Sequence, residues 1–315
     1  MKKKNKYLIE NIEYSDDEIA KKILNKNRIS DIIFYLTYLL LTLLYCSFIF
    51  IRISTVALLF ISIIYVIFAL ELSFLQKAYS QRLMRETINI TVCPEAFFNI
   101  NLYNAKKIIC KEKAYNYFVS NIAKAYILLG KTEKAQKIIK NLDKNKKNIK
   151  LQGEILQNKI DIAFIKRDLK EFNKQYENLN KISKFLPKRF KKENGLSNKI
   201  KRSVLEKDIT EVDNLCELVN KKKDKYTKIM SAYYKGTVLE ESGNDNYNDY
   251  YKFVADNGNN LMIANQVRKK LKINDIKHVY KNKKHIIYNT FKIITFIILL
   301  FINFVWLTNL FAHLK

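Results

Sequence analysis

The sequence predicts an all-α protein that combines a membrane helical hairpin, a large helical cytoplasmic region and a C-terminal transmembrane helix. Two long apolar stretches follow one another between residues 32 and 75, and a third lies between residues 286 and 311. In the region between them, apolar residues recur every three or four positions, which is typical of amphipathic helices. No alternating pattern long enough for a β-strand occurs there.

The composition is strongly basic. The 315 residues include 57 Lys and Arg against 30 Asp and Glu, giving a net charge of +27, and only 6 Gly and 2 Pro. Such a charge suits nucleic acid or an anionic membrane surface. The lysines are spread along every predicted helix rather than gathered in one patch, and a bias toward Lys, Asn, Ile, Tyr and Phe is what an AT-rich genome produces. Nucleic-acid binding is therefore disfavoured.

Residues 1–30 are predicted to form a basic cytoplasmic N-terminal segment. The run from Ser15 to Glu18 resembles a capping box that opens a short helix, with a solvated tail as the alternative. The segment is not a signal peptide, because the following apolar stretch begins too late, is too long and lacks a small-residue cleavage site.

Residues 31–76 are predicted to form a two-helix transmembrane hairpin. A helix needs about 20 apolar residues to cross a bilayer core, and the stretches 32–51 and 55–75 both meet this length. Basic residues flank the outer ends of the hairpin, whereas its turn holds only Arg52. The positive-inside rule therefore places the N-terminus and everything after the second span in the cytoplasm. Glu71 is expected to reach the interface or to pair with Lys77.

Residues 77–104 are predicted to form a membrane-proximal linker helix, with a break at Pro94. The third span, residues 286–311, follows a cluster of lysines that again marks the cytoplasmic side. Lys292 is expected to snorkel to the headgroups, and Trp306 to lie in the aromatic belt. The predicted location is the cell membrane, with three spans and both the N-terminus and the soluble domain in the cytoplasm.

Residues 105–285 form the predicted cytoplasmic domain, and they contain a repeat. The clearest unit combines a large residue, an apolar–small pair, an aromatic, a turn glycine and a second small residue, here Val119, Ile122, Ala123, Tyr126, Gly130 and Ala135. This spacing resembles the tetratricopeptide repeat (TPR). Small residues at Ala123 and Ala135 let two antiparallel helices approach closely, and Gly130 supplies the turn.

Three weaker units follow, in residues 163–179, 207–219 and 232–243. The four turn positions lie 37, 40 and 36 residues apart, compared with a family period of about 34; they are Gly130, Arg167, Lys207 and Gly243. The resemblance implies a TPR-like α-solenoid, with an ordinary helical bundle as the alternative. The basic run at residues 188–195 is interpreted as a charged loop that interrupts the stack.

The resemblance also implies a binding site. Such repeats mostly bind peptides or protein segments in the groove lined by the first helix of each unit. The implied partner groove comprises Tyr117, Ser120, Asn121, Lys124, Ile127, Tyr233 and Thr237. An Asn and a Lys one turn apart, as at Asn121 and Lys124, can hold a carboxylate.

No catalytic, cofactor or metal motif is found. The three histidines have no Cys or carboxylate partner at ligand spacing, the four cysteines form no CxxC pair, and no phosphate-binding glycine loop or nucleophile motif occurs. The Asn/Asp-rich run at residues 244–249 resembles a calcium loop but lacks the required Gly and Glu, so we interpret it as a polar turn. The sequence therefore does not predict an enzyme, a cofactor or a metal, and the thiols are expected to be reduced and structural.

The expected function is that of a membrane-anchored scaffold that binds a protein or peptide partner at the cytoplasmic face. Anionic lipid headgroups would be attracted to its basic surface by about 1 kcal/mol per Lys or Arg near the bilayer. Two alternatives remain: an accessory subunit of a membrane transporter or peptide-export system, and a membrane-associated nucleic-acid binder. The sequence specifies neither the partner, nor the biological process, nor the oligomeric state.

Overall fold

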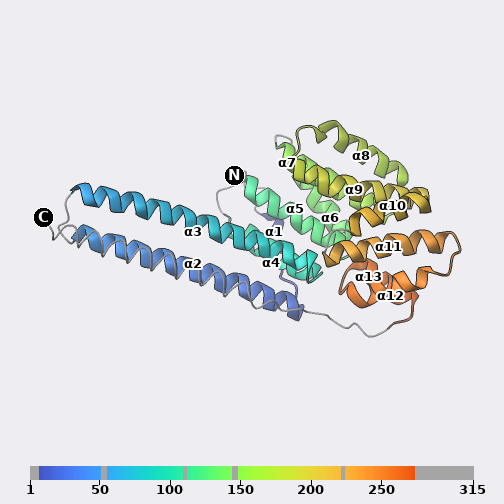
Figure 1. Cartoon of the computed structure of the whole chain (residues 1–315), viewed down its shortest axis with the longest axis horizontal. Helices are drawn as coiled ribbons and strands as arrows, with labels where there is room; N and C mark the ends of the chain where they lie inside the picture. Colours follow the sequence, from blue (N-terminus) through green and yellow to red (C-terminus); the bar gives the residue numbers. More distant parts are fainter. Residues whose placement is uncertain (1–6, 51–54, 109–111, 144–147, 221–223, 274–315) are drawn as a thin grey trace. The chain divides into compact units, whose positions relative to one another are not determined.

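The computed structural model describes residues 7–50, 55–108, 112–143, 148–220 and 224–273 (Figure 1). Every regular element in these ranges is an α-helix, which confirms the all-α part of the prediction. The described chain divides into two compact units. We call residues 24–83 the hairpin unit, and residues 7–23 together with 84–273 the multi-helix unit.

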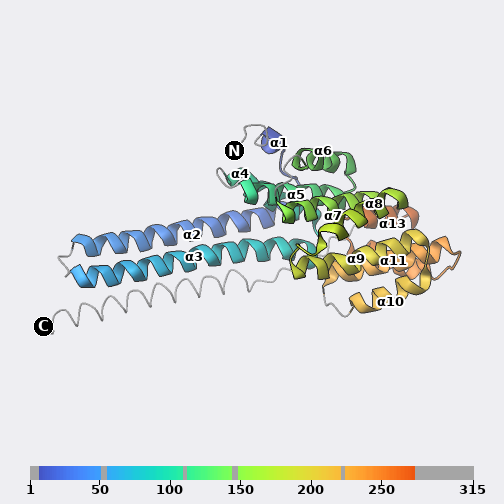
Figure 2. The ribbon, with the colours of Figure 1, turned by 90° about the horizontal axis from the view of Figure 1, so that it is seen from above.

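The hairpin unit contains most of two long helices, α2 (Glu18–Phe50) and α3 (Thr55–Asn89), which lie side by side in both views (Figures 1 and 2). The two helices bury large apolar side chains, including Phe34, Leu41, Ile61 and Leu72. Their outer sides carry exposed Leu, Ile, Val and Phe residues. Both helices are long and apolar enough to cross a membrane.

Polar side chains inside the hairpin unit are paired across the two helices. The hydroxyls of Thr42 and Tyr65 lie 3.0 Å apart, and those of Tyr45 and Ser62 lie 2.9 Å apart. Tyr38 donates to the backbone carbonyl of Ala69 at 2.7 Å. Interhelical hydrogen bonds of this kind satisfy polar groups that an apolar environment would otherwise penalise.

The long helices extend beyond the predicted spans. With 33 residues, α2 is about 50 Å long, against a bilayer core of about 30 Å. It begins directly after Asp17, whose Oδ1 accepts a hydrogen bond from the backbone of Ala20 at 2.8 Å. The short helix predicted after Ser15 is therefore the first turn of α2 itself. The third predicted span, 286–311, lies outside the described residues.

The multi-helix unit begins with the short helix α1 (Tyr7–Glu10) and, after α3, with α4 (Pro94–Lys107). Pro94 occupies the start of α4, which confirms the predicted break. Four helical hairpins follow: α5 (Glu112–Leu128) with α6 (Thr132–Leu142), α7 (Ile149–Ile165) with α8 (Leu169–Ser183), α9 (Lys188–Glu206) with α10 (Ile209–Asn220), and α11 (Lys225–Glu241) with α12 (Tyr247–Asn257). A last described helix, α13 (Met262–Lys270), completes the unit.

The four hairpins share one turn geometry. The turn residues have positive φ angles of 75°, 57°, 61° and 74°; they are Gly130, Arg167, Lys207 and Gly243. In each turn, the N–H of this residue bonds to the carbonyl three residues earlier, and the next N–H bonds to the carbonyl five residues before it. This left-handed arrangement satisfies the last carbonyls of the first helix. The four turn positions named from the sequence are thus the places where the chain reverses.

The sequence analysis predicts a loop for the basic run at residues 188–195. This prediction is wrong, because the run forms the first two turns of α9. Pro187 directly precedes the helix, a position where its missing N–H has no cost. Phe190 in this run is 9% exposed and joins the core between α7 and α9. The burial of one aromatic face therefore holds the charged run in a helix.

The first helices of successive hairpins contact one another in the order α5, α7, α9, α11. After α12 the chain turns back, and its apolar side chains Leu261, Ile263, Ala264 and Val267 join a cluster that includes Val92. The side-chain amide of Asn259 donates to the carbonyl of Thr91. The end of the hairpin series is therefore attached to the segment that precedes its beginning.

Candidate functional site

Two of the groove residues expected from the sequence are committed to internal contacts. Ser120 is 2% exposed and accepts a hydrogen bond from Asn158 of α7 at 3.2 Å. Asn121 is 8% exposed and donates to Oδ1 of Asn101 of α4 at 3.0 Å. Both side chains join α5 to neighbouring helices, so their polar atoms are directed at the protein itself.

Tyr117 and Lys124 lie apart from the cavity described below. The ring of Tyr117 packs edge-on against Phe118, and the ammonium of Lys150 lies 5.4 Å from its centroid. Lys124 is half-buried on α5. Asn121 and Lys124 were expected to hold a carboxylate of the partner. The side-chain amide of Asn121 donates to Asn101 instead, so only Lys124 remains for that role.

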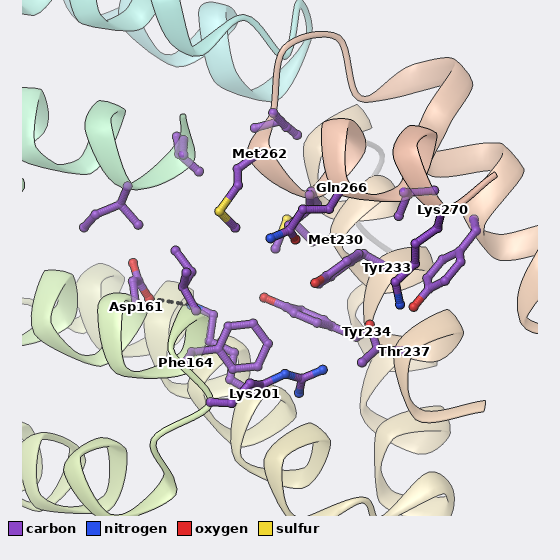
Figure 3. A pocket seen from close by; sticks show the side chains of 18 of the residues that line it. Asp161, Phe164, Lys201, Met230, Tyr233, Tyr234, Thr237, Met262, Gln266 and Lys270 are labelled. Atoms are coloured by element: carbon purple, nitrogen blue, oxygen red, sulfur yellow. Dashed lines mark hydrogen bonds and ion pairs between the residues drawn. The ribbon is translucent and has the colours of Figure 1, made fainter. Parts of the chain in front are cut away.

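The other three expected residues meet at a cavity of about 480 Å³ (Figure 3). Ile127 comes from α5, whereas Tyr233 and Thr237 come from α11. Further residues of α5 and α11, together with residues of α7, α9, α12 and α13 and of the segments next to them, complete the lining. Side chains from all four hairpins and from the returning helix therefore enclose one space.

Aromatic and sulfur-containing side chains form one wall of the cavity (Figure 3). Phe164 meets Tyr234 edge-on, with ring centroids 5.6 Å apart. Tyr233 lies 6.1 Å from Tyr234 on its other side. Met230 and Met262 add polarisable thioethers, which adapt to varied apolar shapes. The wall suits an apolar or aromatic group rather than a fully hydrated ion.

An ion pair also borders the cavity. Lys201 Nζ lies 2.6 Å from Asp161 Oδ1, and both side chains are largely buried (Figure 3). Gln157 donates to the same carboxylate oxygen at 3.0 Å. Burial raises the pKa of the nearby Tyr226 and Tyr234 hydroxyls, so both stay protonated at neutral pH and can donate hydrogen bonds.

Further charged side chains lie along the cavity lining and are also paired. Arg167 bonds to Glu241 at 2.8 Å, and Lys270 bonds to Glu240 at 2.7 Å. Burial alone would raise the pKa of Glu240, but hydrogen bonds from Lys270 and from Tyr251 lower it below its usual value. This carboxylate therefore remains ionised at neutral pH.

Thr237 offers a free polar group inside this lining. Its side chain is 3% exposed, and its Oγ1 has no hydrogen-bond partner among the described residues. The hydroxyl lies near Tyr233 and Tyr251 without reaching hydrogen-bond geometry. A buried hydroxyl left unpaired costs free energy, and a ligand or a water in the cavity would recover it.

Sequence analysis assigned only Ile127, Tyr233 and Thr237 to this site and missed the other lining residues, among them Asp161 and those of α13. Asp161 stands between the apolar residues Ile160 and Ile162 on a core helix, and a charge in that context signals a buried partner. The sequence holds no comparable signal for the residues of α13. They follow the last repeat unit and reach the cavity only because the chain turns back after α12.

The ranges that the structure describes contain neither a candidate metal site nor a reactive thiol. No group of three or more His, Cys, Asp or Glu side chains there could hold a metal ion. Cys46, Cys93 and Cys216 are free thiols. Burial raises the pKa of Cys216 to about 11, so its unreactive protonated form dominates.

Comparisons with protein-family models, with curated proteins and with solved structures found no match. The chemistry of the cavity is therefore the guide to function.

Proposed function

We propose that this chain is a membrane-anchored helical-repeat protein that binds a segment of a partner protein at the cytoplasmic face. An apolar or aromatic side chain of that segment enters the cavity. The observation that carries this proposal is the position of the cavity, which is lined by the first helices α5, α7, α9 and α11 of all four hairpins. In TPR-like solenoids the corresponding helices line the partner groove.

The repeated turn geometry supports the solenoid part of the proposal. Four hairpins with the same left-handed turn residue, at nearly regular intervals, are what stacking of one supersecondary unit produces. Ile127, Tyr233 and Thr237 were assigned to the groove by the resemblance, and all three line the cavity.

The size and chemistry of the cavity support a side chain as its occupant. Binding pockets range from about 300 to 1,000 Å³, and 480 Å³ accommodates a large aromatic or aliphatic side chain with part of its neighbours. Aromatic and thioether walls would bury its apolar surface, while Thr237 Oγ1 and the tyrosine hydroxyls would meet a backbone or side-chain polar group.

Membrane anchorage rests on α2 and α3, whose apolar length suffices to cross a bilayer. The third span and the positive-inside orientation would attach the multi-helix unit to the membrane at both of its ends. A doubly attached unit would hold its cavity close to the bilayer, so binding would recruit or position a partner there.

The test uses full-length protein purified from its own host in mild detergent, with Gln266→Trp and Lys252→Trp variants beside it. Gln266 is an exposed residue of the cavity lining, whereas Lys252 is exposed on α12 outside the lining. We expect a stoichiometric partner, identified by mass spectrometry, with the wild type and with Lys252→Trp, and its loss with Gln266→Trp.

A partner that all three proteins retain would contradict the proposal that the cavity binds it. That result would instead favour binding through the spans, as the transporter-subunit alternative requires. The absence of any partner from the wild type would contradict the scaffold function. Because both substitutions introduce the same bulky residue at an exposed position, a general effect of tryptophan would appear in both variants.

A further inference from the structure

A second surface of the multi-helix unit carries charge that the cavity does not use. Residues 181–192 contain six Lys and Arg and no Asp or Glu. Eight residues in this stretch are exposed, and we call six of them the α8–α9 patch: Lys181, Lys184, Phe185, Lys188, Lys191 and Lys192. The patch covers the end of α8, the connection to α9 and the first turns of α9.

The connection is anchored so that these side chains face outward. Leu186 and Phe190, 4% and 9% exposed, pack into the core beside Gly153 of α7, where a Cβ atom would come within 2.8 Å of Leu186. Phe185 lies next to these buried residues yet is 61% exposed. The ammonium of Lys184 lies 5.0 Å from its ring. A large aromatic side chain is thus displayed on a fixed backbone among cations.

The lysines of the patch are not neutralised. None of the five forms an ion pair with any residue in the described ranges, whereas Lys201 and Lys235, farther along the chain, pair with Asp161 and Asp213. Five positive charges around one exposed aromatic ring make a surface that attracts anions and also offers apolar area. This combination is found on protein surfaces that bind the membrane interface.

We propose that the α8–α9 patch docks on the anionic surface of a lipid bilayer, with its lysines among the headgroups and Phe185 at the boundary with the acyl chains. The chain itself favours a bilayer over other polyanions. Its helices α2 and α3 are long and apolar enough to cross a membrane and continue without interruption into the multi-helix unit, so lipid would be present at high effective concentration. Nucleic acid attracts lysines equally but is not held nearby by any part of the described chain.

The test places full-length protein in neutral phosphatidylcholine nanodiscs, which occupy the spans, and measures its sedimentation with added vesicles. We expect binding to vesicles that contain phosphatidylglycerol and none to pure phosphatidylcholine. The variant Lys188→Gln/Lys191→Gln/Lys192→Gln should bind the anionic vesicles about 100-fold more weakly, about fivefold per lysine. Phe185→Ala should weaken binding by a factor that raised salt does not change.

A matched control removes the same charge elsewhere. Lys137, Lys140 and Lys228 are exposed lysines outside the patch, and their triple Gln variant should retain affinity within about fivefold of the wild type. An equal loss in this control would overturn the proposal by showing that only net charge matters. Unchanged vesicle binding by the patch variant would also overturn it. So would tight, patch-dependent binding of a single-stranded oligonucleotide without vesicle binding. None of these readouts involves the cavity.

Discussion

The guanidinium of Arg268 attaches α13 to the end of α12. It is 4% exposed and donates to the carbonyl of Ala255 at 3.0 and 2.6 Å, to the carbonyl of Asn259 at 2.6 Å and to Oδ1 of Asn265 at 2.9 Å. Hydrogen bonds from a charged donor each contribute about 1.5–3 kcal/mol. Helix α13 is therefore held by this one side chain as well as by its apolar face.

Arg268→Met keeps the apolar stem and removes the donors, which leaves buried carbonyls unpaired. We expect the free energy of unfolding to fall by about 3–5 kcal/mol. Chemical denaturation followed by circular dichroism measures it. Lys269→Met, at an exposed neighbouring position, should change it by less than about 0.5 kcal/mol. Equal stability of the two variants would show that Arg268 does not anchor α13.

Glu95, at the start of α4, makes stability depend on pH. Burial raises the pKa of its carboxyl above the usual 4.5, and the nearby Asp17 carboxylate raises it further. The folded state therefore binds this proton more tightly than the unfolded state does. Its contribution to stability is complete below pH 4.5 and is lost as the pH rises through the folded pKa.

Glu95→Gln removes this titration. We expect the variant to melt at a higher temperature than the wild type at pH 7, with the difference shrinking toward pH 4. Melting temperatures of both proteins across this range test the prediction. A difference in melting temperature that does not change with pH would mean that the Glu95 carboxyl has the same pKa in the folded and unfolded states.

At the scale of elements, two turn glycines differ only in their surroundings. Gly130 and Gly243 have φ angles of 75° and 74°. A Cβ atom at Gly130 would lie 2.8 Å from Cγ of Met262 in α13, whereas at Gly243 it would meet nothing within 4 Å. The same substitution therefore separates backbone strain from the contact with α13.

Gly243→Ala should lower the free energy of unfolding by about 1 kcal/mol, because a side chain disfavours the left-handed backbone region. Gly130→Ala should cost about 1–3 kcal/mol more, because Met262 must move as well. Urea denaturation of the two variants gives both values. Equal costs would indicate that Met262 does not rest on the first turn in solution.

Local signals in the sequence predicted the hairpins, but not everything that packs on them. Gly130 and Gly243 mark their turns because glycine favours positive φ, and Arg167 and Lys207 were found from the interval between repeats. The run at residues 188–195 was misread because its charges outnumber the one buried aromatic, Phe190, that holds it in α9.

The site was only partly predictable, for a related reason. Ile127, Tyr233 and Thr237 line the cavity as the repeat pattern suggested, but Ser120 and Asn121 bond to neighbouring helices. An Asn that faces a groove and an Asn that joins two helices look alike in one sequence. The return of α13 depends on long-range fit to Gly130 and to Thr91, which no local period encodes.

At the scale of the whole molecule, the proposed topology can be tested with one surface position. Lys252 is exposed on α12. In a variant whose native cysteines are replaced by Ala, Lys252→Cys should react with a membrane-impermeant maleimide only after the cells are permeabilised, because the multi-helix unit is expected in the cytoplasm. Labelling of intact cells would show that the multi-helix unit lies outside the cytoplasm, opposite to the proposed orientation.

The attachment of residues 258–268 to Thr91 and Gly130 also bears on how the fold comes apart. A linear repeat array frays from its terminal units, which exchange their amide hydrogens fastest. Here the terminal hairpin α11–α12 shares its apolar cluster with Val92 and Leu128, which lie near the start of the series. Opening at one end must break contacts at the other, so the hairpins should unfold as a single cooperative block, with amide protection in α11 matching that in α5.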